Sequence, residues 1–475
     1  MQTNLYIDGN WVPSQSAQRF DVMNPATEDV IASVASADVF DADLALNAAS
    51  TAMQEWAARS PRDRSEVLRK AWELMTARLP EFARLITLEN GKANADAMGE
   101  ANYAAEFFRW FAEEAVRVDG LISHAPASGA RIIVQHKPAG IAVLVTPWNY
   151  PAAMGTRKIA PALAAGCAVI IKPASETPLT MLALMPLLEE AGVPKGVVNV
   201  LPSRNTGVLV DHMLHDPRVR VVSFTGSTEV GRKLLHSAAD QILKPAMELG
   251  GNAPAIVFED ANLDGAVEGV MLAKMRNLGE ACTAANRIYV HSSIAPAFTE
   301  KFTSAMAELK IGNGLEAGID VGPLVNSDTR NKVDAFVQDA VAKGAKVELG
   351  GVLPTGKGFF YPPTVLSGVP ETADCVGDEI FGPVAALQVF NDQEDVIRRA
   401  NDTEYGLVAY VFSEDMKRAL QVCERLDYGM VGLNRGLVSD PAAPFGGTKQ
   451  SGLGREGGHE GMHEFMETQY ISASW

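Results

Sequence analysis

Two residues in the middle of the chain have the types and surroundings that covalent catalysis requires. Cys282 lies among small residues, directly after a Gly-Glu turn signal. A thiol at such a turn can be exposed and reactive, although a lone cysteine is more often a small buried side chain. Glu248 stands beside a Gly-Gly pair earlier in the chain. A thiol and a carboxylate on two glycine-rich loops indicate a nucleophile and a general base.

The elements that must position these residues form two series of alternating strands and helices. The first has predicted strands at 141–145, 168–171, 197–201 and 220–224, with helices from about 155, over 179–191 and near 205–213. The second has strands at 254–258, 287–291, 385–390, 407–412 and 430–434, with helices at 264–277, 295–308 and 415–425. Continuous apolar strands between helices predict βαβ units and parallel sheets covered on both faces. We therefore expect an α/β protein with two doubly wound parallel-sheet domains.

Polar segments follow three strands of the first series. They are Thr146 to Tyr150, Lys172 to Glu176 and Thr225 to Glu229. Ligands of parallel sheets bind beyond the carboxyl ends of the strands, so these segments are candidate binding sites. The third segment opens a helix with small residues, where free backbone N–H groups can hold a pyrophosphate. No Gly-x-Gly-x-x-Gly motif is present, so this signal is weak on its own.

Three further segments bear on the arrangement of the chain. Residues 5–12 read as a β-hairpin with Gly9-Asn10 as the tight turn. The predicted strand at 131–135 is expected to project as an edge strand, and another subunit or segment usually covers such an edge. Residues 469–472 are expected to pair with it. Aromatic residues at 107–111 are either core or a wall of a substrate site.

The composition excludes several classes of protein. With 475 residues and 47% hydrophobic residues, the chain can bury large cores and should form two or three domains. A net charge of −17 without clustered basic residues argues against a nucleic-acid partner and favours small-molecule ligands. The four cysteines form no Cys-x-x-Cys motif or Cys/His cluster, so neither a disulfide framework nor a metal site is indicated.

Neither the amino terminus nor any apolar run has the pattern of a targeting or membrane segment. The chain begins Met-Gln-Thr-Asn, without the basic and apolar regions of a signal peptide. The longest apolar run, at 159–171, is shorter than the roughly 18 residues that a membrane span needs. The sequence therefore predicts a cytoplasmic protein with no membrane partner.

Seven motifs in order resemble those of the aldehyde dehydrogenase superfamily over nearly the whole chain. They are Pro-Trp-Asn at 147–149, Lys-Pro-Ala at 172–174, Phe-Thr-Gly-Ser at 224–227, Glu-Leu-Gly-Gly at 248–251, Cys282, Glu-Ile-Phe-Gly-Pro at 379–383 and Pro-Phe-Gly-Gly at 444–447. The resemblance implies a cofactor-binding domain from 1–120 and 139–248 and a catalytic domain from 249–440. It also implies a small β oligomerisation element from 121–138 and 441–475, and hence a homodimer or homotetramer.

The resemblance also implies a mechanism that suits these residue types. Cys282 is expected to add to an aldehyde, to pass hydride to a nicotinamide through a thiohemiacetal, and to retain the acyl group as a thioester. The Asn149 amide and the Cys282 backbone N–H are expected to form the oxyanion hole. Glu248 is expected to be the general base for thioester hydrolysis.

The cofactor-binding residues implied by the resemblance lie in the same motifs. Lys172 is expected at the adenosine ribose, Gly226 and Ser227 at the pyrophosphate, and Glu379 at the nicotinamide ribose. The full set is Thr146, Pro147, Trp148, Asn149, Lys172, Ala174, Ser175, Glu176, Gly226, Ser227, Leu249, Glu379 and Phe381.

Position 175 bears on the choice between NADP and NAD. Relatives restricted to NAD commonly have a glutamate three residues after the motif lysine, whereas this chain has Ser175 there. A serine hydroxyl can donate to a 2′-phosphate and Lys172 adds a positive charge, so we predict that NADP is accepted and preferred. Glu176 opposes this prediction, because its carboxylate can turn toward the ribose and repel the phosphate. NAD therefore remains the alternative cofactor.

The resemblance narrows to the succinate-semialdehyde dehydrogenases. Their substrate has a carboxylate remote from the aldehyde, and the matching residues for binding it are Arg157, Arg276 and Ser439. Asp440 adds a negative charge beside this group, so glutarate semialdehyde, one methylene longer, is the nearest rival substrate.

Two further possibilities concern regulation and function. Some relatives have a second cysteine two residues after the nucleophile that forms a redox-switch disulfide, but this chain has Ala284 there, so that regulation should be absent. A non-catalytic binding protein on the same fold is the remote alternative, and a missing nucleophile, base or oxyanion donor would indicate it. None of the three is missing.

Overall fold

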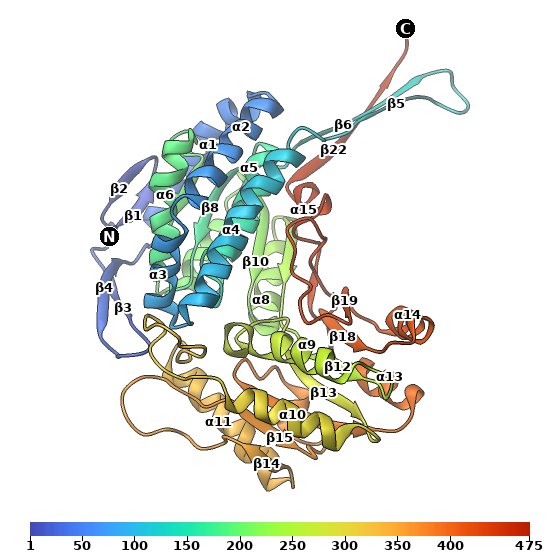
Figure 1. Cartoon of the computed structure of the whole chain (residues 1–475). Coiled ribbons are helices and arrows are strands. Elements are labelled where there is room, and N and C mark those ends of the chain that lie inside the picture. Colours follow the sequence, from blue (N-terminus) through green and yellow to red (C-terminus); the bar gives the residue numbers. More distant parts are fainter.

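The first domain is built on an eight-stranded sheet. The computed structural model describes residues 1–475. Figure 1 shows this domain above a second domain, and a narrow arm projects from the molecule at the upper right. The strand order is β2-β1-β9-β8-β7-β10-β11-β21. The bounds are β1 Leu5–Ile7, β2 Asn10–Val12, β7 Ile141–Val145, β8 Ala168–Lys172, β9 Val198–Val200, β10 Val219–Thr225, β11 Lys244–Glu248 and β21 Gly452–Leu453.

Five strands of this sheet, from β9 to β11, run parallel, as the sequence predicts. Their order reverses between β7 and β10, which places a crevice at the carboxyl ends of these two strands. Every residue of β7 and β8 is buried, because helices cover both faces of the sheet. This burial explains why both strands read as continuous apolar runs.

Two groups of helices cover the two faces. One face packs against α1 Val39–Ala58, α7 Thr206–Leu214 and α8 Thr228–Ala239. The other face packs against α5 Ala153–Ala165 and α6 Leu179–Ala191, with α2 Pro61–Thr76, α3 Leu79–Asn90 and α4 Asn94–Glu114 outside them. The aromatic residues Phe107, Phe108 and Phe111 are buried in this core, so the cluster is packing rather than a substrate wall.

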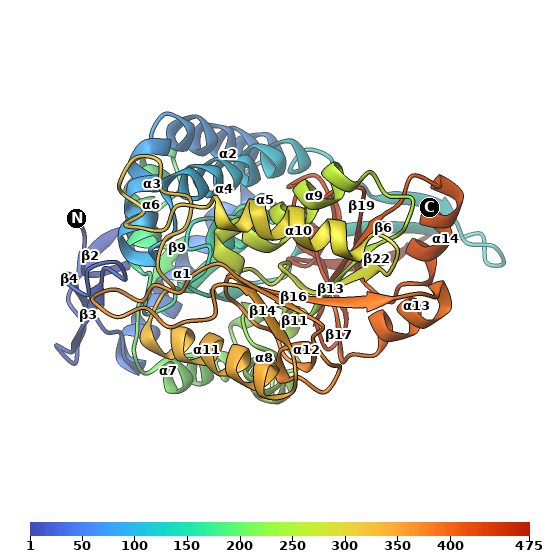
Figure 2. The same ribbon diagram turned by 60° about the horizontal axis from the view of Figure 1, so that its bottom comes forward.

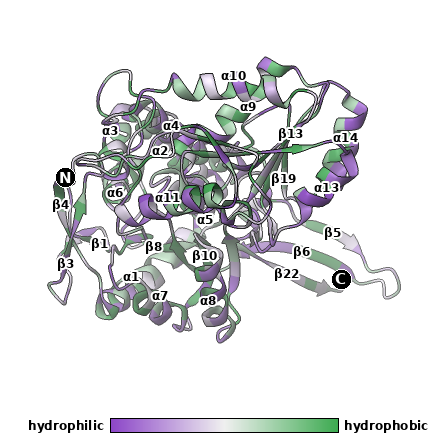
Figure 3. Cartoon of the chain, turned by 90° about the horizontal axis from the view of Figure 1, so that it is seen from below, coloured by the Kyte–Doolittle hydropathy of each residue, from purple (hydrophilic) through white to green (hydrophobic).

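The second domain has a seven-stranded sheet of order β14-β15-β16-β13-β12-β18-β19. Its strands run parallel except β14, which is antiparallel to β15. Figure 3 shows that β13 is coloured as hydrophobic. The strand bounds are β12 Ala253–Val257, β13 Ala285–His291, β14 Lys346–Leu349, β15 Thr364–Ser367, β16 Val384–Phe390, β18 Val408–Phe412 and β19 Met430–Leu433.

Helices also cover both faces of the second sheet, and Figure 2 shows α10 and α11 on its outside. One group comprises α9 Leu263–Met275 and α10 Ala295–Ala307, and the other comprises α13 Gln393–Asn401 and α14 Met416–Arg425. Two further helices, α11 Ser327–Ala342 and α12 Asp374–Gly377, pack in a separate core, and a 3₁₀ turn, η1 Arg276–Gly279, follows α9. None of the helices is long and apolar enough to cross a membrane.

The arm is a three-stranded antiparallel sheet of order β22-β6-β5. Its strands are β5 Leu121–His124, β6 Arg131–Pro138 and β22 Met466–Ala473, and β22 pairs with β6 from Met466↔Pro138 to Ala473↔Arg131. The predicted pairing of the two chain segments is therefore present. The rest of the last segment does not join the arm, because β21 extends the first sheet and β20 Thr448–Lys449 pairs with β17 Tyr405–Gly406.

The amino-terminal segment contains two small antiparallel pairs. The hairpin of β1 and β2 is present, but its turn is Asp8-Gly9 rather than the predicted Gly9-Asn10, since Ile7 pairs with Asn10. Both turn residues have positive φ, 51° and 69°, as a type I′ turn requires. The second pair is β3 Arg19–Met23 with β4 Val30–Ala35, and a short α15 Glu460–His463 lies before β22.

Candidate active site

The candidate site lies where the two sheets face each other. The carboxyl ends of β7, β8 and β10 point toward it, as predicted for the first sheet, and so does that of β11, which was not predicted. The second sheet contributes the opposite edge, because Cys282 precedes β13 and Glu379 precedes β16. Residues 249–252 connect the end of β11 to the start of β12 and so join the two edges.

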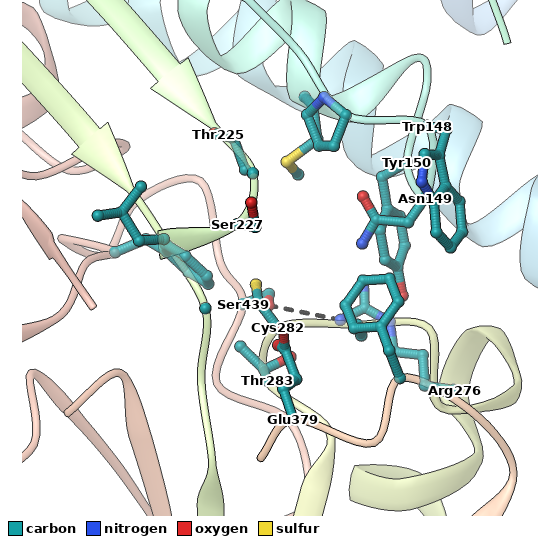
Figure 4. A pocket seen from close by; sticks show the side chains of 18 of the residues that line it. Trp148, Asn149, Tyr150, Thr225, Ser227, Arg276, Cys282, Thr283, Glu379 and Ser439 are labelled. Carbon is teal, nitrogen blue, oxygen red and sulfur yellow. Dashed lines mark hydrogen bonds between the residues drawn. The ribbon is translucent and has the colours of Figure 1, made fainter. Parts of the chain in front are cut away.

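A cavity of about 250 Å³ brings most of the predicted residues together. In Figure 4, Cys282, Asn149, Arg276, Glu379 and Ser439 surround one space. The predicted residues in its wall are Pro147, Trp148, Asn149, Arg157, Gly226, Ser227, Leu249, Arg276, Cys282, Glu379, Phe381 and Ser439. The residues that sequence reasoning did not identify include Tyr103, Met154 and Thr283.

A wider groove of about 810 Å³ continues from this cavity across the carboxyl edge of the first sheet. The two spaces share Pro147, Trp148, Thr225, Gly226 and Ser227. The remaining predicted cofactor residues line the groove, namely Thr146, Lys172, Ala174, Ser175 and Glu176. One elongated ligand can therefore reach from Lys172 to Cys282.

Cys282 has the surroundings of a nucleophile that must be activated. Burial raises the pKa of the thiol to about 12, and the nearby negative charge of Glu379 adds to the shift, whereas Arg157 opposes it. Its backbone N–H has no acceptor within the protein. A Cβ atom on Gly251 would overlap the Cys282 carbonyl, so glycine at 251 lets the two edges approach.

Asn149 holds its side chain toward the nucleophile segment. Its Nδ2 donates to the Glu280 carbonyl at 2.9 Å, and its Oδ1 has no partner. Because an amide nitrogen has two hydrogens, one donor remains for a ligand oxygen. Together with the free N–H of Cys282, this donor is suited to stabilising a developing negative charge on oxygen.

Glu248 is the one predicted catalytic residue that does not line the cavity. It ends β11, it is buried, and its Oε2 has no hydrogen-bond partner. Burial raises the pKa of its carboxyl well above the usual range, and Glu456 raises it further, while Arg157 and Lys158 lower it. A carboxyl group with such a raised pKa can accept a proton near neutral pH.

The two predicted arginines differ in their partners. Arg157 pairs with Glu456 at 2.5 Å between Nε and Oε2, and its guanidinium lies 4.1 Å from the Phe445 ring. Arg276 has no acidic partner within ion-pair distance, and its Nη1 donates to Ser439 Oγ at 3.4 Å (Figure 4). Arg276 is therefore a positive charge in the cavity wall that has no acidic partner.

Two aromatic rings complete the surroundings of Arg276. The guanidinium lies 5.2 Å from the Tyr150 ring and 5.8 Å from the Tyr103 ring. Asp440 is exposed and accepts a hydrogen bond from the backbone of Ala442, so its carboxylate does not enter the cavity. The negative charge that the sequence placed beside the carboxylate site therefore lies outside it.

The groove contains groups that fit a dinucleotide. The Lys172 side chain is buried without a hydrogen-bond partner, and burial lowers the pKa of its amine to about 8, against the effect of Glu176. Ser227 caps α8, and a Cβ atom on Gly226 would overlap the Phe224 ring. An orphan cation at one end and a helix start lined by small residues suit a phosphate-bearing ligand.

The nicotinamide end of such a ligand would meet Glu379, Trp148 and Phe381. Glu379 Oε1 accepts the Gly251 N–H at 3.2 Å, and burial raises the pKa of its carboxyl to about 7. The rings of Trp148 and Phe381 pack edge to face at 5.3 Å. No group of three His, Cys, Asp or Glu side chains is arranged to hold a metal ion.

The comparison with known proteins agrees with this arrangement. A profile described as "Aldehyde dehydrogenase family" matches residues 11–471. The succinate-semialdehyde dehydrogenase of Paenarthrobacter nicotinovorans is 52% identical over 442 residues, covering 93% of this chain and 98% of that protein. The glutarate-semialdehyde dehydrogenase of Pseudomonas putida is 48% identical over 471 residues, covering 99% of this chain and 97% of that protein.

The fold agrees as well. A crystal structure titled as an Escherichia coli NADP-dependent enzyme matches with a TM-score of 0.98 at 44% identity, covering 100% of this chain and 98% of that one. The predicted α/β class with doubly wound parallel-sheet domains is confirmed. With a profile match over nearly its whole length and relatives near 50% identity, the chain belongs to the aldehyde dehydrogenase family.

Proposed function

We propose that the protein oxidises succinate semialdehyde to succinate with a nicotinamide dinucleotide. The observation that carries this proposal is Arg276, whose guanidinium contacts Ser439 and has no acidic partner in a cavity that also holds Cys282. Arg276 is half-buried, and a substrate carboxylate would supply the opposite charge that it lacks. The relative from Paenarthrobacter, whose name gives this activity, supports the same substrate.

Cys282 begins the proposed reaction by adding its thiolate to the aldehyde carbon. The carbonyl oxygen becomes an alkoxide, which the Asn149 amide and the Cys282 N–H stabilise. When bound, the dinucleotide supplies the acceptor for the hydride that leaves this carbon. The acyl group then remains on Cys282 as a thioester. Glu248 takes a proton from water, whose oxygen adds to the thioester, and the Cys282 sulfur leaves as succinate forms.

The carboxylate end of the substrate is held by three side chains in this proposal. Arg276 supplies the charge, Ser439 donates from its hydroxyl, and Arg157 contributes Nη2, which has no partner within the protein. Glutarate semialdehyde is the second candidate, since the relative from Pseudomonas putida is named for it. Both substrates have an aldehyde and a carboxylate, and they differ by one methylene.

The groove is proposed to bind NADP in preference to NAD. Lys172 and Ser175 offer a cation and a hydroxyl, and the NADP-dependent enzyme from Escherichia coli supports the assignment. Ser175 Oγ donates to Glu176 Oε2 at 3.1 Å, so this bond must break before the hydroxyl can donate to a 2′-phosphate. Glu379 and Leu249 would hold the nicotinamide half, and Gly226 and Ser227 the pyrophosphate.

The same proposal assigns roles to the parts of the chain. Residues 1–120 and 139–248 would bind the cofactor, and residues 249–440 would carry the nucleophile. The arm would join subunits into a homodimer or homotetramer, because its apolar side chains are uncovered in one chain. Ile122 is 73% exposed and Trp475 is 80% exposed.

A kinetic panel tests the substrate assignment. Succinate semialdehyde, glutarate semialdehyde and butanal should be compared with each cofactor by the formation of reduced nicotinamide. The proposal expects the highest kcat/KM for succinate semialdehyde. A higher kcat/KM for glutarate semialdehyde would select the second candidate, and equal values for butanal would contradict recognition of a carboxylate.

A further inference from the structure

Asn277 joins the two segments that form the proposed oxyanion hole. Its Nδ2 donates to the Asn149 carbonyl at 3.0 Å and to the Glu280 carbonyl at 3.0 Å. Asn149 belongs to the loop after β7, whereas Glu280 and Cys282 belong to the loop before β13. One buried amide group therefore spans the boundary between the two sheets beside the nucleophile.

The backbone at Asn277 is held in a conformation that is costly for these residues. Asn277 has φ 51° and ψ 44°, and Leu278 has φ 41° and ψ 32°. Two consecutive left-handed residues other than glycine cost about 1–2 kcal/mol each and persist only where surrounding contacts hold them. Asp96 provides such a contact, because its Oδ2 accepts the Asn277 N–H at 2.9 Å.

A buried ion pair anchors the Asn149 loop, and its acidic member, Glu100, lies on α4, the helix that also contains Asp96. Lys92 Nζ lies 2.5 Å from Glu100 Oε2 and donates to the Asn149 carbonyl at 2.6 Å. Glu100 Oε1 accepts the backbone N–H groups of Ala152 at 2.8 Å and Ala153 at 3.3 Å. These groups start α5, which has no side-chain cap of its own, so Glu100 caps it from α4.

Asp96 and Glu100 are four residues apart on α4 and therefore lie on one face of that helix. Through them, the first turns of α4 contact the two segments that carry the proposed oxyanion hole. We propose that Asn277, together with Asp96, Glu100 and Lys92, is a positioning cluster that sets the separation between the Asn149 amide and the Cys282 N–H. This inference rests on the proposed function. None of the four side chains lines the cavity, so they act through Asn149 and Cys282.

The cluster should affect the step in which charge develops on oxygen. Displacing an oxyanion donor by about 1 Å, or removing it, costs about 100-fold in rate. Loss of the Asn277 bridge leaves Asn149 Nδ2 with its own bond to Glu280, so a partial loss of about 10- to 100-fold is expected in hydride transfer. Binding of the substrate carboxylate at Arg276 should change little, because KM depends on contacts elsewhere in the cavity.

The direct test is Asn277→Gly, because glycine keeps the left-handed backbone and removes only the bridging amide. Asn434→Gly is the matched control. Asn434 also has a positive φ, 52°, and its Nδ2 bonds a backbone carbonyl, that of Ser413 at 2.8 Å, but it lies outside the cavity. The measurements are the pre-steady-state burst of reduced nicotinamide, KM, and the rate of Cys282 alkylation by iodoacetamide.

The expected result is a burst about 10- to 100-fold slower for Asn277→Gly, with KM and the alkylation rate near those of the wild type. Alkylation displaces iodide from a saturated carbon and uses no oxyanion hole, so it reports the state of the thiol alone. In an Asn149→Ala background, Asn277→Gly should add little further loss, because the separation that the cluster sets no longer matters once the Asn149 amide is absent. Additive losses, or an equal loss in Asn434→Gly, would overturn the inference.

A second pair of variants covers the case in which Asn277→Gly does not fold. Asp96→Ala removes the acceptor of the Asn277 N–H, whereas Asp96→Asn retains an acceptor oxygen. The burst should be slower in the alanine variant and recover toward the wild-type rate in the asparagine variant. Equal bursts in the two variants would overturn the inference alone. A wild-type protein that forms no reduced nicotinamide from succinate semialdehyde would overturn the proposed function, and this inference with it.

Discussion

The Arg157 guanidinium is ion-paired with Glu456, with 2.5 Å between Nε and Oε2, inside the protein. Lys158 pairs with the other oxygen of Glu456. Glu456 therefore compensates two cations that lower the pKa of the Glu248 carboxyl, and Glu456 itself raises that pKa. Arg157 thus links the substrate cavity to the surroundings of the proposed base, whereas Arg276 is available to a substrate.

The two arginines should consequently respond differently to substitution. Arg276→Ala is expected to lower kcat/KM for succinate semialdehyde, with little change for butanal. The loss in transition-state stabilisation should be about 1.5–3 kcal/mol, the value of a charge-assisted hydrogen bond. Arg157→Ala should lower kcat/KM for both aldehydes, because it also leaves Glu456 without its partner. Steady-state kinetics with the two aldehydes check this. An equal loss for both aldehydes in Arg276→Ala would show that this arginine is structural.

Glu248→Gln should separate the two halves of the reaction. Glutamine cannot take a proton from water, so hydrolysis of the thioester should stop while hydride transfer continues. Rapid mixing with aldehyde and cofactor should give one reduced nicotinamide per active subunit and then a stall. Sustained turnover at the wild-type rate would mean that another group is the base.

The pH dependence of hydrolysis should depend on Glu456. The raised pKa keeps the Glu248 carboxyl protonated at low pH, so hydrolysis should be slow there and should rise as pH passes through that pKa. Glu456→Gln removes a negative charge and leaves two cations nearby, which lowers the pKa of Glu248 and should move the acidic limb to lower pH. The rate of thioester hydrolysis measured against pH checks the direction, and a shift to higher pH would contradict it.

Cofactor preference should respond to the two residues after the motif lysine. Ser175→Glu should favour NAD, because a carboxylate at this position repels a 2′-phosphate. Glu176→Gln should raise kcat/KM for NADP relative to NAD, since it removes the carboxylate that Ser175 contacts. The ratio of kcat/KM for the two cofactors is the measurement. A wild type that strongly prefers NAD, or a ratio unchanged in Ser175→Glu, would show that Ser175 is not the selector.

Parts of the fold were predictable because local burial determines the sequence pattern. The strand at 141–145 has the predicted bounds, since both of its faces are buried and every residue is apolar. The strand β11, by contrast, was not predicted, because it contains Pro245 and its pattern is not that of a central strand. The predicted hairpin turn was displaced by one residue, because both Asp8-Gly9 and Gly9-Asn10 are turn-forming pairs.

The site likewise contains residues that the sequence could identify and contacts that depend on tertiary packing. The resemblance identified many of the residues that line the cavity but not Tyr103, Met154 or Thr283, and the roles of Cys282, Asn149 and Glu248 stay predictions. The pairing of Arg157 with Glu456 could not be predicted, because it joins α5 to a loop near the end of the chain and depends on tertiary packing. The bridge of Asn277 was missed for the same reason, since neither of its carbonyl partners has a sequence signature.

The most direct test of the account is to trap the acyl group on the nucleophile. The Glu248→Gln protein should be mixed with succinate semialdehyde and NADP, quenched in acid, and analysed by peptide mass spectrometry, with Glu248→Gln/Cys282→Ala as the control. The account predicts one succinyl group on the peptide that contains Cys282, matched by one reduced nicotinamide, and neither in the control. A succinyl group on another residue, or reduced nicotinamide formed without Cys282, would contradict it.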